Sequence, residues 1–284
     1  MKAIDAVLED LIDYAGLYAP AALDMRTAVQ NYLDYGRNKN AAALGRFVVD
    51  ITRLPDLRES AAEHSSSMRL TVVAPADAAC NELSQFIDNG FSIESVEIKI
   101  SQLLEIERVM TSIPSSVTAY FEVPVQADSS EALDAISALG GRAKLRMGGL
   151  VAEAFPTSEA IAHKLAALVE RGVPFKATAG LHHPIRSRHP FTYASDSAVG
   201  TMHGFLNLIC ATALIYFGGE TSDSLNLINE EDPGAFKVAA DTISWRSFQW
   251  STDQLREVRQ KFFLSFGSCS FVEPMRDLEA RGWL

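Results

Sequence analysis

The feature that most constrains this chain is a regular alternation of short β-branched segments with amphipathic helical segments. Strands are predicted at 47–51, 70–74, 95–100, 117–123, 143–147 and 175–179. Helices are predicted between them, at 76–89, 103–111, 130–139 and 158–171. Strands that alternate with helices at a spacing of about 25 residues predict βαβ units and a parallel sheet.

The first predicted strand lacks the signature of a doubly wound, nucleotide-binding sheet. Such a sheet usually carries a glycine-rich phosphate turn after its first strand. Here residues 49–55 read VDITRLP and contain no GxGxxG motif. We therefore predict an α/β fold of the (β/α)8 TIM-barrel type rather than an open sheet.

The last third of the chain follows the pattern less regularly. Residues 196–219 are predicted to be helical, so the last strands are expected at 225–228 and 265–271. Residues 236–238 and 243–245 fit a small hairpin inserted in a loop. The STDQ sequence at 251–254 matches a capping box and predicts the start of a final long helix.

The N-terminal region has apolar residues at helical spacing. We expect residues 1–45 to form extra helices ahead of a barrel made by residues 46–284, and the whole chain, 1–284, to form a single domain. The sequence leaves open whether these helices cap the barrel or mediate homo-oligomer formation.

Composition excludes several classes of protein. With 48% hydrophobic and 21% charged residues, the chain is neither disordered nor collagen-like. Its net charge of −11 argues against a nucleic-acid or membrane partner. The three cysteines are too few and too widely spaced for a disulfide scaffold, and no secretory signal is apparent, so we expect a cytoplasmic protein.

Two predicted strands carry basic residues and end in glycine turns. Lys144 and Arg146 share one face of the first strand, and Lys176 lies on the next strand. A lysine buried in a parallel strand needs a charged partner, and Glu122 at the end of the preceding strand is a candidate. Because barrel active sites form at the carboxyl ends of strands, we expect these side chains to meet in one pocket together with His182 and Arg186. The alternatives are a salt-bridge network inside the barrel, or lysines that face outward.

These segments resemble the deoxyribose-phosphate aldolase group of class I aldolases. In that family one lysine forms a Schiff base, a second lysine on a later segment lowers the pKa of the first, and a Gly-Thr-Ser turn binds phosphate. By order along the chain, the resemblance implies Lys144 as the first lysine and Lys176 as the second, with Gly180 and Arg186 in the second segment's turn. It implies that residues 267–270, which read GSCS, form the phosphate turn.

The sequence departs from the family at several positions. Arg146 occupies a position that the family fills with a small residue, and two histidines interrupt the second segment. The lysines also fall on the fifth and sixth predicted strands, one earlier than in the family. The KLRMGG, FKATAGLHHP and MHGFLN segments further resemble bacterial barrel-like proteins of unassigned function, which implies no activity.

Histidines gather after the second lysine, at His182, His183, His189 and His203. Such a cluster suits proton transfer or metal binding. Adjacent histidines point in opposite directions, and no HxH or HExxH spacing is present, so we predict no metal site and no cofactor. Asn207 lies one helical turn after His203 and shares its face.

The sequence predicts a small-molecule enzyme whose substrate is anionic or bears a carbonyl group, with lyase or aldolase chemistry favoured. The alternatives are a metal-dependent or acid-base isomerase or hydrolase that uses the histidines, and a non-catalytic anion-binding or scaffold protein. The candidate catalytic residues are Lys144, Lys176, Glu122 and His182. The candidate substrate-binding residues are Arg146, Arg186, Gly148, Gly149, Gly180, His183, His203, Asn207, Gly267 and Ser268.

Overall fold

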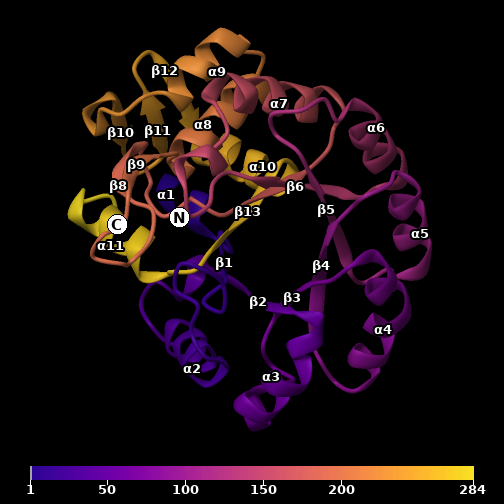
Figure 1. Cartoon of the computed structure of the whole chain (residues 1–284). Coiled ribbons are helices and arrows are strands. Elements are labelled where there is room, and N and C mark those ends of the chain that lie inside the picture. The colour runs from indigo at the N-terminus through magenta and orange to yellow at the C-terminus, as the bar shows by residue number, and fades with distance from the viewer. Residues whose placement is uncertain (1) are drawn as a thin grey trace.

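The computed structural model describes residues 2–284 and shows a closed barrel of parallel strands (Figure 1). Around the barrel the strand order is β1-β13-β7-β6-β5-β4-β3-β2. The barrel strands are β1 (Ile12–Tyr14), β2 (Leu44–Asp50), β3 (Leu70–Val73), β4 (Ile93–Lys99), β5 (Thr118–Val123), β6 (Arg142–Arg146), β7 (Phe175–Thr178) and β13 (Phe263–Ser268). The predicted (β/α)8 fold class is confirmed.

Helices connect successive strands and surround the barrel, as the arc of α3 to α6 shows in Figure 1. The helices are α1 (Ala3–Leu8), α2 (Met25–Tyr35), α3 (Leu54–Ala61), α4 (Ala76–Asp88), α5 (Leu104–Ser112), α6 (Ser130–Leu139), α7 (Ser158–Glu170), α8 (Phe205–Tyr216), α9 (Thr221–Ile228), α10 (Thr252–Lys261) and α11 (Val272–Ala280). Polar caps fix several of their ends. The Asp24 side chain accepts from the Thr27 N–H at the start of α2, and Ser251 and Gln254 form the predicted capping box of α10.

The apolar core lies mainly between the strands and the surrounding helices. Phe205 of α8 stacks on Phe266 of β13 with ring centroids 5.0 Å apart, and Phe175 packs edge-on against Phe263 at 5.2 Å. Helix α8 is buried over almost its whole length, which agrees with its apolar sequence. This outer core leaves the inside of the barrel available for polar side chains.

The N-terminal region differs from the expectation that residues 1–45 are helical and precede the barrel. Strand β1 lies within it, between α1 and α2, and pairs with both β2 and β13. A strand of only three residues, all buried, is too short to interrupt the helical periodicity of its flanks. Counting β1, the two lysines lie on the sixth and seventh strands along the chain rather than the fifth and sixth.

A long insertion between β7 and β13 holds two small antiparallel sheets. The first is the hairpin of β8 (Ser187–Pro190) and β9 (Val199–Met202). The second contains β10 (Phe236–Val238), β11 (Thr242–Trp245) and β12 (Phe248–Ser251), so the predicted hairpin is present with a third strand. Residues 196–219 are only partly helical, because β9 precedes α8.

The expectation of a barrel strand at 225–228 is wrong, because this segment belongs to helix α9. Its buried residues are Ser224, Leu227 and Ile228, which recur at helical spacing and form one face. The strand missing from the predicted set is β1, while β13 matches the strand expected at 265–271.

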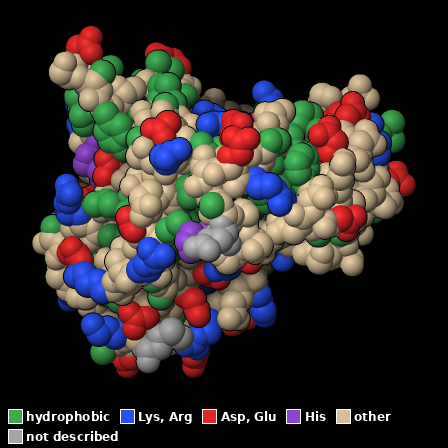
Figure 2. Space-filling model, turned by 90° about the horizontal axis from the view of Figure 1, so that it is seen from below, with side chains coloured by type: hydrophobic (Ala, Val, Ile, Leu, Met, Phe, Trp, Pro, Cys, Tyr) green, Lys and Arg blue, Asp and Glu red, His purple; other side chains and the backbone are tan. Residues whose placement is uncertain are grey.

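The surface mixes charges of both signs, as the face in Figure 2 shows. Acidic and basic side chains are interspersed there, with smaller apolar groups between them. Within residues 2–284, no helix has the length and apolar character needed to cross a membrane.

Candidate active site

The barrel interior carries a ladder of alternating charges formed by Asp13, Lys176, Glu97, Lys144 and Glu122. The Lys176 Nζ atom lies 2.5 Å from Asp13 Oδ2 and 2.6 Å from Glu97 Oε1. The Lys144 Nζ atom lies 2.8 Å from Glu97 Oε2 and 3.0 Å from Glu122 Oε2. Glu97 therefore binds one lysine with each of its oxygens.

Strand register explains why these side chains meet. Glu122 of β5 is paired with Lys144 of β6, Lys144 with Lys176 of β7, and Lys176 with Ser265 of β13. Paired residues on neighbouring parallel strands point to the same face of a sheet. The structure thus places both lysines on the interior face, as expected from the alternation along each strand.

The carboxylates raise the proton affinity of both lysines. Burial alone would lower the pKa of Lys144, but the negative charges of Glu97 and Glu122 outweigh burial and hold this pKa above its usual value. The same balance, with Asp13 and Glu97, raises the pKa of Lys176. Burial would raise the pKa of Glu97, and the two lysines instead lower it to about 2. The expectation that Lys176 lowers the pKa of Lys144 is therefore wrong for this state, because Glu97 lies between them.

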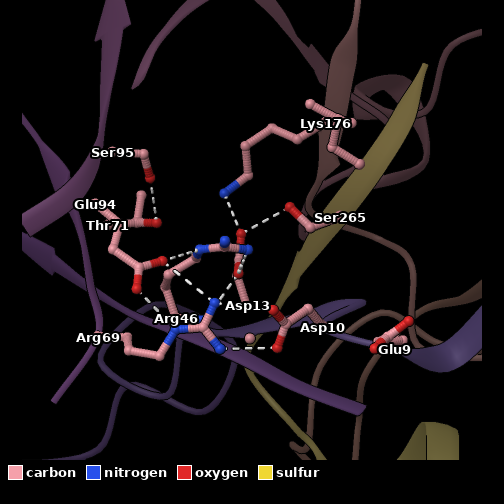
Figure 3. A network of polar contacts seen from close by, with 12 residues as sticks. Glu9, Asp10, Asp13, Arg46, Arg69, Thr71, Glu94, Ser95, Lys176 and Ser265 are labelled. Carbon is pink, nitrogen blue, oxygen red and sulfur yellow. Dashed lines mark hydrogen bonds and ion pairs between the residues drawn. The ribbon is translucent and has the colours of Figure 1, made fainter. Parts of the chain in front are cut away.

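A second polar network continues from Asp13 (Figure 3). Asp13 Oδ1 accepts the backbone N–H of Arg46 at 2.8 Å, and Asp13 Oδ2 accepts the Ser265 hydroxyl at 2.8 Å. Arg46 and Arg69 both donate to Glu94, and Arg69 also donates to Asp10. Asp13 is thus held by backbone, hydroxyl and ammonium donors, and its position is fixed.

A cavity of about 440 Å³ opens at the carboxyl ends of the strands. Its walls include the last residues of β3, β4, β6 and β7, which are Val73, Lys99, Arg146 and Thr178. Glu97, Glu122 and Lys144 also line it, whereas Lys176 is fully buried below and does not. Lys144 is the lysine that a ligand in the cavity can reach, since its side chain is 10% exposed.

Besides Lys144, two exposed cations border this cavity. Lys99 and Arg146 are both exposed, and neither forms an ion pair within the described part of the chain. Arg146 Nε donates to the carbonyl oxygen of Gly148 at 3.2 Å, which folds the guanidinium back toward the glycine turn. These two cations are available to an anionic group of a ligand.

The glycine turns bring β6 and β7 close together. Gly180 has φ of +70°, and a Cβ atom there would lie 2.7 Å from Phe155 and 2.9 Å from the Cα of Gly148. Gly149, Gly180 and Gly267 line the cavity. Gly148 instead packs against Phe155.

In the expected phosphate turn at 267–270, one hydroxyl group is already hydrogen-bonded within the turn. The hydroxyl of Ser268 donates to the carbonyl oxygen of Ser270 at 2.8 Å and accepts its N–H at 3.3 Å. Gly267 faces the cavity, and Cys269 lines it as well.

The histidines have separate partners. His182 lines the cavity, and its Nδ1 lies 2.8 Å from Glu273 Oε2. His183 Nδ1 lies 2.7 Å from Asp277 Oδ2, and its ring stacks on that of His189 with centroids 3.3 Å apart. Among the side chains that the structure describes, no group of three from His, Cys, Asp or Glu is arranged to hold a metal ion.

Several predicted binding residues do not line the cavity: His183 and Ser268 have the contacts given above, and Arg186, His203 and Asn207 lie farther along the chain. Arg186 pairs with Glu231 and donates toward His203 Nδ1 at 3.2 Å, in a separate depression beside α7. His203 Nε2 lies 2.8 Å from the carbonyl oxygen of Pro156, and burial lowers the pKa of this ring to about 4. Asn207 is fully buried and binds only backbone groups. The expectation that Arg186 joins the lysine pocket is wrong.

Sequence reasoning missed Asp13, Glu97, Lys99 and Tyr18, which form or border the site. Glu97 and Lys99 alternate with apolar residues in the strand at 95–100, which is a signal that two polar side chains face one side. Asp13 and Tyr18 carry no such signal, because β1 is short and Tyr18 follows it in a loop.

No protein-family model matches the sequence, and no curated protein sequence matches it. Among solved structures, the chain is similar to the arginine decarboxylase of Paramecium bursaria Chlorella virus, with 11% sequence identity and a TM-score of 0.41. A second structure of that enzyme, bound to agmatine, matches with 10% identity and a TM-score of 0.40. The matches cover 77% of this chain and 57% and 58% of those chains. The chain therefore spans less than two thirds of these structures.

Proposed function

We propose that this protein is a lyase of the class I aldolase type, in which Lys144 forms an imine with the carbonyl group of a small anionic substrate. The observation that carries the proposal is the position of the Lys144 amine. It lies at the cavity, in contact with two carboxylates, and its side chain is mostly shielded from water. A positioned amine with an adjacent proton acceptor is the arrangement that carbonyl addition requires.

Glu122 is the proposed proton carrier. Glu97 is held as an anion by two lysines, whereas Glu122 has Lys144 as its ion partner and lines the cavity. Because Glu97 and Glu122 hold the pKa of Lys144 above its usual value, the free amine is a minor species, formed when the ammonium gives a proton to Glu122. This amine adds to the carbonyl carbon as the π electrons move to oxygen. A second proton passes from nitrogen to that oxygen. Glu122 then returns its proton to the hydroxyl, which leaves as water and yields the protonated imine.

Lys176 has a different proposed role from the one that the aldolase resemblance implies. It is fully buried between Asp13 and Glu97 and has no access to the cavity. Its charge keeps Glu97 ionised, and ionised Glu97 holds the Lys144 amine in place. We therefore assign Lys176 as a positioning residue and Lys144 as the nucleophile.

The two exposed cations at the cavity indicate the charge of the substrate. Lys99 ends β4 and Arg146 ends β6, on either side of the strand that carries Glu122. A carboxylate or phosphate between them would gain charge-assisted hydrogen bonds. The proposed substrate is therefore a short carbonyl compound with one anionic group.

A second candidate is acid-base chemistry at His182. Its ring lines the cavity, and Glu273 binds Nδ1, which leaves Nε2 as the second ring nitrogen. A carboxylate that orients a histidine in this way supports proton transfer. In this case Lys144 holds the substrate and forms no covalent bond.

Borohydride reduction in the presence of pyruvate tests the imine. We expect a stable adduct on the peptide that contains Lys144 and none on the peptide that contains Lys176, which serves as an internal control. The Lys144→Arg variant keeps the positive charge but removes the nucleophilic amine at neutral pH, so it should lose the adduct. Lys99→Met and Arg146→Met should each weaken pyruvate capture by about tenfold.

The alternatives give different results. Loss of activity in His182→Gln together with retained activity in Lys144→Arg would favour acid-base chemistry. Anion binding without any adduct or turnover would favour a binding protein. Labelling of Lys176 in preference to Lys144 would show that the assignment of the two lysines is wrong.

A further inference from the structure

We infer that the Tyr18 hydroxyl is a substrate-binding group that donates a hydrogen bond to an oxygen at the end of the substrate remote from its anionic group. The inference rests on the proposed function and adds a specificity-determining residue to it. Tyr18 lines the same cavity as Lys144 and Glu97, although it comes from the segment between β1 and α2.

The backbone of Tyr18 is fixed. Its N–H donates to the carbonyl oxygen of Ala15 at 2.9 Å, and its own carbonyl oxygen accepts the N–H of Ala22 at 2.9 Å. These two bonds form turns on both sides of the residue, so the side chain enters the cavity from a defined point on the wall.

The hydroxyl of Tyr18 is buried and has no hydrogen-bond partner. In the described part of the chain, this is true of only two other side-chain groups, those of Ser224 and Arg281, and neither of these residues lines the cavity. Leaving a buried donor unpaired is unfavourable, and folded proteins rarely do so. Because Tyr18 lines the cavity, its unpaired hydroxyl is explained if a ligand supplies the partner.

Protein groups nearby do not supply this partner. Both oxygens of Glu97 already bind lysines. Burial raises the pKa of Tyr18, and the negative charge of Glu97 raises it further, so the phenol keeps its proton. Tyr18 therefore offers an O–H donor rather than a phenolate, and an uncharged or partly negative oxygen is the ligand group that fits it.

Barrel topology places this donor across from the two exposed cations. In the closed order, three strands lie between β1 and β5 in either direction, so β1 and β5 lie on opposite walls. Tyr18 follows β1, while Lys99 and Arg146 end the two strands that flank β5. A substrate that spans the cavity would place its anionic group on the cation side and a hydroxyl or carbonyl oxygen toward Tyr18.

The test compares 3-hydroxypyruvate with pyruvate, which lacks the additional oxygen. Binding is measured as the ligand-induced shift in melting temperature, and imine formation as the rate of borohydride trapping on Lys144. We expect the wild type to favour 3-hydroxypyruvate by about tenfold or more, because a site built around a donor discriminates against a ligand that leaves it unpaired. Tyr18→Phe should reduce this preference to within about twofold.

Stability of the ligand-free protein provides a second readout. Tyr18→Phe removes an unpaired buried hydroxyl and should raise the melting temperature by about 2–4 °C. Tyr32→Phe is the matched control, because the buried Tyr32 hydroxyl donates to the carbonyl oxygen of Gly45 at 2.9 Å. That variant should lower the melting temperature.

The outcomes separate the inference from the proposed function. An unchanged preference in Tyr18→Phe, or a fall in its melting temperature like that of Tyr32→Phe, overturns the inference. If neither compound is trapped but the binding preference is present and depends on Tyr18, the imine proposal fails and the inference stands. If neither compound binds the wild type, both fail.

Discussion

Replacing Lys176 with methionine should strongly destabilise the protein. The change removes a fully buried ammonium that contacts Asp13 at 2.5 Å and Glu97 at 2.6 Å, and it keeps a side chain of similar length. Two carboxylates, with side chains 1% and 4% exposed, then lose a counter-charge. Asp13 keeps the Ser265 hydroxyl and the Arg46 N–H, and Glu97 keeps Lys144.

The expected cost follows from breaking a buried ion pair on one side. Removing one partner of such a pair typically costs about 3–5 kcal/mol, because the remaining charge is left uncompensated. For a chain of this size, that loss corresponds to a fall in melting temperature of about 10 °C. The remaining partners of Asp13 and Glu97 hold the cost within this range.

Urea unfolding followed by circular dichroism measures this effect. The midpoint should fall with little change in the slope m, since the surface exposed on unfolding is the same. Adding Asp13→Asn to Lys176→Met should recover part of the loss, because it removes one of the uncompensated charges. Lys261→Met is the control: it breaks an exposed pair with Glu257 and should leave the midpoint unchanged. A midpoint for Lys176→Met equal to that of this control would refute the buried-ladder account.

Two further predictions concern stability. Asn207→Ala should cost about 3 kcal/mol in urea unfolding, because it leaves the Arg186 N–H and the Glu230 carbonyl unpaired and removes one of the donors to the Leu227 carbonyl, while Lys144 trapping with pyruvate stays unchanged. The pKa of Glu97 is lowered from 4.5 to about 2, so its contribution of about 3 kcal/mol is present above pH 4.5 and is lost as the pH falls toward 2. Glu97→Gln should make the free energy of unfolding depend less steeply on pH in this range, and an equal slope in both proteins would contradict the assignment.

The sequence predicts most of the barrel because its central strands are long enough to be recognised. β2 to β7 each have four or more residues, and β2 to β6 are followed by turns and amphipathic helices. β1 has three residues between helices, and local pattern alone does not distinguish it from its flanks. β1 is recognised as a strand only by its pairing with β2 and β13. The partners of Ile12 in these pairs are Leu44 and Phe266, which are far from Ile12 in the sequence.

The sequence predicts only those features of the site that follow from the alternation of side chains along a strand. Alternation places Lys144 and Lys176 on one face, but it does not show which lysine reaches the cavity. That difference depends on Asp13, which belongs to the strand that the sequence does not reveal. Strand alternation does not predict the position of Arg186 either. This residue follows the turn at 179–180, where both residues have positive φ, and the chain after the turn leads away from the cavity to β8.

The charged ladder also bears on why the barrel has this interior. Layers of branched apolar side chains usually fill such a barrel, and a buried ion pair seldom stabilises more than apolar side chains of similar volume. Stability alone therefore does not account for Asp13, Lys176, Glu97 and Lys144 in this position. A role in positioning the Lys144 amine does account for them. Lys144 and Glu122 are the members of the ladder at the cavity, and the buried charges beneath them fix the Lys144 amine through Glu97. If the ladder exists to position that amine, Lys176→Met should impair imine formation in the fraction of molecules that remains folded, beyond its effect on stability.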